Sequence, residues 1–408
     1  MERRFRLDGV RYLCHLNALI WLVPAVIYLV FPFDFPIPVN WYVVLPIIAA
    51  TIMVPYVSAS FASVLKFQPP QAGESATFLR LTFLAALLSP ALLFIDLFIF
   101  RGLSPLGDIE INRAIYMETG SSLVGYIALF GLAASLYLLT KSREDFSKWF
   151  LLPWSANVLV FILSGNRQYA LLGIILLFFS RFISRSSRIT VLSVIYFFSG
   201  ILAFATAALS IQFLRQLSKE GRQTEFLYAI SGIECRGWIC ENPIEPPLLY
   251  IYGYFGNIYS GLTIAASDIA HAPVLSLTVP VLYRRFSSLM DAPRQDVVTE
   301  RIANSIEGRH DIFPNFWATM HAAVYYEGGF VGVLLLLALA FIFLTYIFSV
   351  WIKFGGSRFQ SFACIGMSFL AVGVMYFPLS EPVNFFLFVG VCCSLLVLPR
   401  SKVWKSAI

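Results

Sequence analysis

The sequence predicts an all-α, polytopic integral membrane protein with about 10–12 transmembrane helices and one large loop region outside the membrane. Hydrophobic residues make up 59% of the 408 residues, and charged residues make up only 13%. A soluble domain of that composition would lack the polar residues needed to cover its surface. Apolar stretches of spanning length recur along the chain, and a helix satisfies its own backbone hydrogen bonds in lipid.

Each predicted span corresponds to an apolar stretch that approaches the ~20 residues needed to cross a ~30 Å hydrocarbon core. The first stretch has no small-residue cleavage site after it and is followed by many more. We therefore interpret it as the first transmembrane helix rather than as a signal peptide. The stretches lie near residues 12–30, 41–65, 78–100, 121–140, 149–164, 169–183, 189–212, 329–352, 359–378 and 383–399.

The distribution of basic residues predicts the topology. With a cytoplasmic N-terminus, seventeen lysines and arginines fall on the inside, and only Arg101, Arg113 and Arg167 fall in short outside turns. This is the bias that the positive-inside rule requires, so both termini are predicted to be cytoplasmic. The remaining basic residues lie in one outside stretch, about 213–315, which is too long for a simple connector.

Three consecutive segments follow from this topology. Residues 1–212 form an N-terminal transmembrane bundle of about seven spans, residues 213–315 a large outside region, and residues 316–408 the C-terminal transmembrane helices. The outside region must contain an even number of crossings if the C-terminal basic residues are to stay inside. We therefore favour re-entrant or interfacial helices at 248–270 and 274–288, with a true pair of extra spans as the alternative.

The middle of the outside region is rich in tyrosine. Tyr250, Tyr252 and Tyr254 alternate along the chain, and Tyr259 follows them. Irregular backbone at membrane depth must be covered by protein or line a cavity, where these rings could contact a glycan. An aromatic belt at the membrane interface is the alternative interpretation.

Six cysteines are divided between the spans and the outside region. Cys235 and Cys240 share the outside region at a spacing that permits a disulfide in an oxidising compartment, and the sequence leaves open whether they are bridged. A metal site is disfavoured, because no histidine lies near the pair and two thiols are half of a structural zinc site. The other four are interpreted as packing residues: Cys14, Cys364, Cys392 and Cys393.

Arginines on the outside are the main candidates for ligand binding. Arg167 lies in a short turn between two apolar stretches and could be a snorkelling anchor or bind a ligand. Arg284 and Arg285 directly follow an apolar run, where a diphosphate headgroup would lie. Arginine suits that group because its planar fork binds phosphate oxygens bidentately and keeps its charge. The later charges, Arg309 among them, could instead be pairs on a solvated helix.

The stretch "PNFWATMHAAVYYEGGFVGVLLLL" is too long for one span. We expect Phe316 to Tyr326 to run along or just above the outer surface before the chain turns down at Gly328 and Gly329. Glu327 then lies at the mouth of a helix, where the dipole would stabilise a capping carboxylate. His310 and His321 flank this segment, and either could be a general base or a polar surface group.

These residues resemble those of bacterial oligosaccharide repeat-unit polymerases, which are related to the O-antigen ligases. One point of resemblance is a Ser-Gly-x-Arg turn that opens a short apolar helix, here Ser164 to Arg167. A second is a large periplasmic region that bears arginines. A third is an asparagine-containing entry followed by an acidic-x-Gly-x-x-Gly descent, here Asn315 and then Glu327, Gly329 and Gly332.

The resemblance implies a glycosyl transfer between two lipid-linked glycans. A hydroxyl of one repeat unit would attack the anomeric carbon of another, and the undecaprenyl diphosphate would leave. Arginines placed against the developing charge would stabilise the transition state more than the ground state. The candidate diphosphate-binding residues are Arg167, Arg284, Arg285 and Arg309. The candidate catalytic residues, as bases for the hydroxyl proton, are Glu327, His310 and His321.

Other classes of protein remain open. O-antigen ligase-like transfer to another acceptor uses the same donor. A metal-dependent glycosyltransferase with a lipid-phosphate donor would use Asp108 and Glu110 of "GDIEIN", and a membrane O-acyltransferase is suggested by Arg11 and His15 of "LDGVRYLCH". A glycolipid flippase would need buried charge, for which Asp96 is the main candidate.

The sequence contains no phosphate-cradling loop, so we expect no nucleotide. The polymerase interpretation also involves no other cofactor and no metal. The expected partners are the undecaprenyl diphosphate-linked glycan, as donor and acceptor, and membrane lipid, but not nucleic acid. A chain-length regulator protein and a flippase are candidate protein partners. The resemblance implies a multi-pass protein of the bacterial inner (cytoplasmic) membrane whose active site faces the periplasm.

Overall fold

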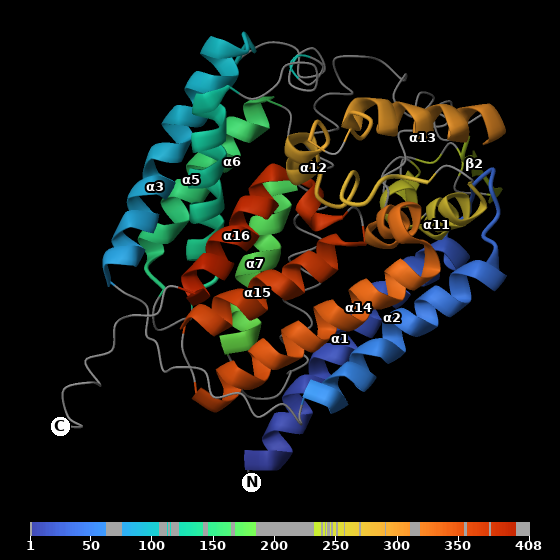
Figure 1. The fold of residues 1–408 in the computed structure, drawn as a ribbon, viewed down its shortest axis with the longest axis horizontal. Coiled ribbons are helices and arrows are strands. Elements are labelled where there is room, and N and C mark those ends of the chain that lie inside the picture. The colour runs from blue at the N-terminus through green and yellow to red at the C-terminus, as the bar shows by residue number, and fades with distance from the viewer. Residues whose placement is uncertain are drawn as a thin grey trace. The chain divides into compact units, whose positions relative to one another are not determined.

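A computed structural model shows a chain built almost entirely of helices (Figure 1). It describes residues 2–62, 76–105, 122–141, 146–164, 168–184, 232–237, 252–256, 258–268, 271–289, 291–310, 319–354, 357–374 and 377–396, and also residues 112, 115, 240, 242, 245, 248 and 249.

The longer helices are α1 (Glu2–Val30), α2 (Trp41–Ala62), α3 (Ala76–Phe94), α5 (Leu123–Leu139), α6 (Leu151–Ser164), α7 (Gln168–Ser184), α11 (Ile258–Ser267), α13 (Gln295–His310), α14 (Met320–Phe354), α15 (Ser357–Val372) and α16 (Pro382–Leu396). The shorter elements are η1 (Ile95–Phe100), η2 (Lys148–Phe150), η4 (Tyr252–Gly256), α12 (Pro280–Phe286), η5 (Pro378–Ser380) and the strands β1 (Phe33–Asp34) and β2 (Glu234–Cys235).

The helices confirm the prediction of an all-α membrane protein. Each predicted apolar stretch except 189–212, which lies outside the described residues, contains a helix over most of its described part. Within the described part of the chain, four helical segments are long and apolar enough to cross a membrane: Leu13–Val30, Trp41–Ser60, Ala76–Phe100 and Met320–Val350. The total number of spans, and the outside region as a whole, stay predictions.

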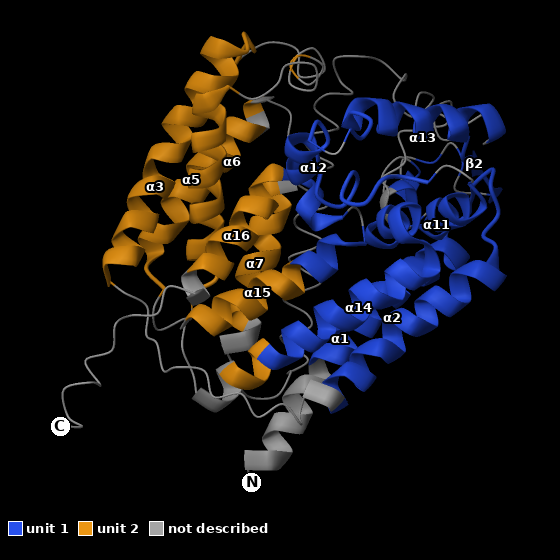
Figure 2. Cartoon of the chain, in the orientation of Figure 1, with its two compact units in different colours: residues 1–65, 205–346, 369–381 blue, residues 66–204, 347–368, 382–408 orange. Residues whose placement is uncertain are grey.

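Two compact units divide the chain discontinuously (Figure 2). Unit 1 contains residues 1–65, 205–346 and 369–381, and unit 2 contains residues 66–204, 347–368 and 382–408. The three consecutive segments expected from the sequence have boundaries near 212 and 315, which lie outside the described residues. That division therefore stays a prediction.

In unit 2, α5 packs closely against α3 because small residues line their contact. A Cβ atom added to Gly131 would lie only 2.6 Å from the backbone oxygen of Ala85. Ser89 Oγ of α3 lies 2.9 Å from Ala128 O of α5 and 2.9 Å from Asn157 Oδ1 of α6. Small residues and hydrogen-bonding side chains are the usual means of joining helices in lipid, where apolar contact alone gives little preference.

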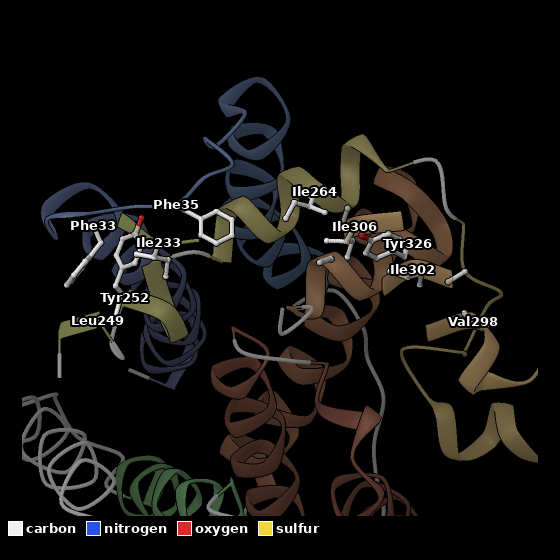
Figure 3. Packing of buried hydrophobic residues seen from close by; sticks show 13 residues of the cluster. Phe33, Phe35, Ile233, Leu249, Tyr252, Ile264, Val298, Ile302, Ile306 and Tyr326 are labelled. Carbon is white, nitrogen blue, oxygen red and sulfur yellow. The ribbon is translucent and has the colours of Figure 1, made fainter. Parts of the chain in front are cut away.

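In unit 1, a buried hydrophobic cluster joins segments that are far apart in the sequence (Figure 3). Phe33 and Phe35 follow α1, Ile264 comes from α11, Ile302 from α13, and Tyr326 from α14. The apolar face of α13 is thereby buried, while its polar face carries the charges that the sequence indicated for a solvated helix. This packing joins α11 and α13 to the end of α1 and to the segment that follows it.

A disulfide joins Cys235 and Cys240, with a Cα–Cα distance of 5.8 Å. It follows β2, which pairs antiparallel with β1 so that Phe33 is opposite Cys235. Arg236 also forms an ion pair with Asp34. The structure thus decides in favour of the bridge that the sequence left open.

The segments 248–270 and 274–288 contain short helices. Helix α11 has 10 residues and α12 has 7, whereas a span needs about 20. Residues 250, 251, 257, 269 and 270 lie outside the described part of the chain, so whether these two segments re-enter or span the membrane stays a prediction.

Helix α14 bends at Gly329, whose φ of 61° and ψ of −161° are not helical. This is one of the two glycines at which the sequence predicted a turn. Of the preceding residues, Ala322, Ala323 and Tyr326 are buried within the protein, and the course of Phe316 to Tyr326 along the outer membrane surface stays a prediction.

Candidate functional site

The carboxylate of Glu327 accepts four hydrogen bonds from one loop. Its Oε1 accepts from the amides of Leu277 (2.7 Å) and Thr278 (2.8 Å). Its Oε2 accepts from the amide of Leu275 (3.0 Å) and from Thr278 Oγ1 (2.8 Å). We call residues 272–279 the carboxylate-bound loop. This geometry makes Glu327 an acceptor for loop amides instead of the helix cap that the sequence suggested.

The carboxylate-bound loop leads directly into α12, which carries Arg284 and Arg285 in its last turn. Both arginines are exposed. Within the described ranges, the side chain of neither arginine makes a hydrogen bond or an ion pair. Exposed apolar side chains accompany them, since Phe286 is 48% exposed and Leu289 is 78% exposed. Cationic and apolar groups therefore lie together at this end of α12.

Tyr283 holds the same turn of α12 from the buried side. Its hydroxyl donates a 2.6 Å hydrogen bond to Pro293 O. Burial raises the pKa of this hydroxyl, and the positive charge of Arg301 offsets part of that shift. Tyr283 is consequently a neutral donor that fixes α12 from its buried side.

Arg309 is part of a contact between α13 and α11. Its Nη1 lies 3.7 Å from Asp268 Oδ1 and donates to Ser267 O at 3.3 Å. Ser305 Oγ of the same helix donates to Asp268 Oδ1 at 2.7 Å, and Arg301 Nη2 donates to His271 O at 3.2 Å. The arrangement shows Arg309 joining two helices. Its side chain is 41% exposed, so the predicted diphosphate contact stays a separate prediction.

His321 lies in the interior of unit 1, only 3% exposed. Its Nε2 lies 2.8 Å from Thr51 Oγ1, whose hydroxyl donates to Ile47 O at 2.7 Å. Because Thr51 has one hydroxyl proton, Nε2 of His321 is the donor between them and Nδ1 keeps its lone pair. Trp21 packs edge-on against the imidazole, with ring centroids 4.1 Å apart.

A small cavity adjoins His321, with room of about 10 Å³ for the centre of a water molecule. Trp21, Thr51, Tyr259 and His321 contribute to its lining. Among the described residues, neither His321 Nδ1 nor Trp21 Nε1 has a hydrogen-bond partner. A single water-sized group is the largest occupant that such a space admits.

Tyr252 is fully buried in the hydrophobic cluster, next to Phe33 at a centroid distance of 5.4 Å and stacked near Tyr28 at 6.3 Å. Its role in the structure is packing. Contact between Tyr252 and a glycan, as the sequence suggested, would require the cluster to open. Tyr250 and the side chain of Tyr254 lie outside the described residues.

Other predicted site residues also lie outside the described part of the chain. They are Arg167, Asn315, and the side chain of His310, together with Asp108 and Glu110 of the metal-dependent alternative. Within the described residues, no group of three or more His, Cys, Asp or Glu side chains is placed to hold a metal ion.

Two residues of the alternative functions have well-defined partners. His15 Nδ1, considered for an acyltransferase, lies 2.6 Å from the hydroxyl of Tyr56. Asp96, considered for a flippase, is 1% exposed and pairs with Arg101, whose Nη2 is 2.9 Å from Asp96 Oδ2. Ser122 also bonds to Asp96 Oδ1 through its amide and hydroxyl.

Sequence reasoning missed Thr278, Thr51 and Trp21. Every residue except proline has a backbone amide, so the residues of the carboxylate-bound loop do not indicate that this loop donates hydrogen bonds to a carboxylate. Thr51 and Trp21 lie within predicted spans. The signal that could have identified Thr51 is a polar side chain deep inside an apolar stretch. Comparison with protein-family models, with curated proteins and with solved structures finds no match.

Proposed function

We propose that this protein is a membrane glycosyltransferase that polymerises undecaprenyl diphosphate-linked oligosaccharide repeat units on the periplasmic side of the bacterial inner membrane. The observation that carries the proposal is the pair Arg284 and Arg285. They are exposed, unpaired within the described residues and next to apolar side chains, in a chain with membrane-spanning apolar helices. A lipid diphosphate is complementary to both kinds of side chain, because its diphosphate is anionic and its lipid chain is apolar.

The two arginines would stabilise the leaving group. When an acceptor hydroxyl attacks the anomeric carbon, the bond to the diphosphate breaks and negative charge grows on its oxygen. Two guanidinium groups aimed at that charge bind the transition state more tightly than the ground state, which is how binding accelerates a reaction. Arg167 and the exposed part of Arg309 are additional candidates for the same diphosphate.

The acceptor hydroxyl must also lose a proton. His321 is a candidate because its Nδ1 has a lone pair and no partner among the described residues. Since His321 is buried, unit 1 would have to open locally before the imidazole could take a proton from the glycan. His310 remains the second histidine candidate.

Two features support the proposed orientation. A disulfide between Cys235 and Cys240 suits an oxidising compartment such as the periplasm. The distribution of basic residues favours cytoplasmic termini. Together they support a periplasmic location for the segments that carry the disulfide and α12.

The test uses the full chain purified in lipid nanodiscs. Lipid-linked repeat units extracted from a strain deleted for this gene serve as donor and acceptor, and products are separated on a gel. We expect a ladder of lengthened glycans. Arg284→Ala combined with Arg285→Ala should lower the initial rate by about 10²-fold. The corresponding lysine variants should recover only part of it, because lysine cannot bind bidentately.

Arg294→Ala is the matched control. Arg294 is 81% exposed and pairs only locally, with Asp296 on the same segment, so its loss should leave the rate unchanged. A wild-type protein that consumes no lipid-linked repeat contradicts the proposal. A single transfer to an added lipid acceptor, without a ladder, would instead identify ligase-like activity.

A further inference from the structure

We infer that Glu327 is a positioning residue, which holds the carboxylate-bound loop and thereby aims Arg284 and Arg285, and that it is not the general base. The role assigned to the arginines rests on the proposed polymerase function. The contact between Glu327 and the loop does not rest on it.

The first step is the occupancy of the carboxylate. Two carboxylate oxygens offer about four acceptor positions in total, and four donors from the carboxylate-bound loop fill them, at 2.7–3.0 Å. A general base needs a free lone pair within reach of the hydroxyl proton. Glu327 would have to give up a loop contact before it could accept one.

The second step is the conformation of the loop. Leu275 has a φ of 70°, a left-handed conformation that residues with a side chain rarely adopt. Such a conformation persists only where its surroundings hold it. The amide of Leu275 donates to Glu327, and the loop also begins with a 3.0 Å bond from the amide of Ala272 to Tyr326 O. Residues 326 and 327 of α14 therefore hold the loop at both ends of its turn.

The third step connects the loop to the arginines. Helix α12 begins at Pro280, two residues after Thr278, and has only 7 residues. A helix this short has little stability of its own, so its neighbours set its direction. Glu327 acts through the loop at one end, and Tyr283 acts through Pro293 on its buried side. Arg284 and Arg285 lie in the last turn of α12, so the contacts that set the direction of α12 also set the position of both arginines.

The key variant is Glu327→Gln. An amide has one carbonyl oxygen, and its nitrogen donates where the loop also donates. With the carbonyl oxygen facing Leu277 and Thr278, the new amide nitrogen would face the amide of Leu275 donor to donor, while Thr278 Oγ1 could turn to accept from it. We expect trypsin cleavage after Arg284 and Arg285 to become at least about 10-fold faster, because cleavage requires local opening. Mass spectrometry of the folded protein in nanodiscs measures the cleavage site by site.

Two controls separate local opening from unfolding. Cleavage after Arg80, at the start of the α3 span, should not change, whereas global unfolding would raise it. Glu300→Gln removes an exposed carboxylate of α13 and should leave both cleavage rates as in the wild type. If Glu327→Gln unfolds the chain, Thr278→Val provides the milder test, since it removes one of the four bonds.

Polymerisation assays then separate positioning from proton transfer. For a positioning role, Glu327→Gln should raise the KM for the lipid-linked donor and leave the shape of the pH–rate profile unchanged. It should also have little further effect when Arg284 and Arg285 are already alanine. Unchanged cleavage at the two arginines, together with loss of a limb of the pH–rate profile, would overturn the inference and restore Glu327 as the base. Faster cleavage in a protein that polymerises nothing would contradict the proposed function alone.

Discussion

The surroundings of Asp96 in unit 2 and of Glu327 in unit 1 use a carboxylate in opposite ways. Asp96 is 1% exposed and pairs with Arg101, whose side chain is 6% exposed. Its other oxygen bonds to Ser122, the residue that caps α5. Glu327 is half-buried and accepts only from neutral amides and one hydroxyl.

The difference shows where a charged ligand could act. Around Asp96 the negative charge is neutralised by Arg101 within the unit, so this region holds η1 against α5. In the other region, the cations of the segment that follows the loop, Arg284 and Arg285, are left to the solvent.

The largest expected effect is that of Asp96→Ala. Removing the carboxylate takes away the ion pair with the buried Arg101 and two hydrogen bonds from Ser122. Breaking a buried pair in this way costs about 3–5 kcal/mol of unfolding free energy. The midpoint of thermal unfolding in detergent measures the change. A midpoint equal to that of the wild type would show that the ion pair of Asp96 does not stabilise unit 2.

A smaller effect is expected from Gly125→Ala. A Cβ atom at this position would lie 2.5 Å from Asp96 Oδ2, so the ion pair or α5 must shift, at a cost of about 1–3 kcal/mol. The same thermal measurement applies. Gly261→Ala in α11 is the matched control, because nothing lies within 4 Å of its Cβ and alanine favours helix. Equal destabilisation of the two variants would argue against crowding at Asp96.

The smallest effect is expected from Thr278→Val. It removes one hydrogen bond to Glu327 while keeping the loop amides, and should cost about 1 kcal/mol. A double-mutant cycle with Glu327→Ala tests the contact directly, because Thr278→Val should cost almost nothing once the side chain that accepts from it is gone. Additive effects would mean that Thr278 contributes to stability independently of Glu327.

The helices were predictable because their cause is local. Nearly any apolar stretch of sufficient length becomes a helix in lipid, and the predicted stretches agree with α1, α2, α3 and α14. The turn at Gly329 was predictable because glycine adopts a positive φ without a steric cost. The arginines at 284 and 285 were identifiable as a charged pair at the end of an apolar run.

The surroundings of individual side chains were not predictable. His321 and Tyr252 were both assigned to a substrate-facing site, and both are buried in unit 1. Their burial depends on Trp21, Thr51 and Phe33, which are hundreds of residues away in the sequence. Composition and spacing contain no information about such pairs, since the packing of several helices brings them together.

The sequence by itself determined that this protein is an all-α membrane protein, because composition and apolar length decide how a backbone can be satisfied in lipid. It also marked the exposed arginines, because charge at the end of an apolar run is visible in the residues alone. Only the tertiary structure decided that Glu327 bonds to the carboxylate-bound loop and that Cys235 bonds to Cys240. Such contacts depend on backbone amides and on distances of a few ångströms, which folding sets and the order of residues does not express.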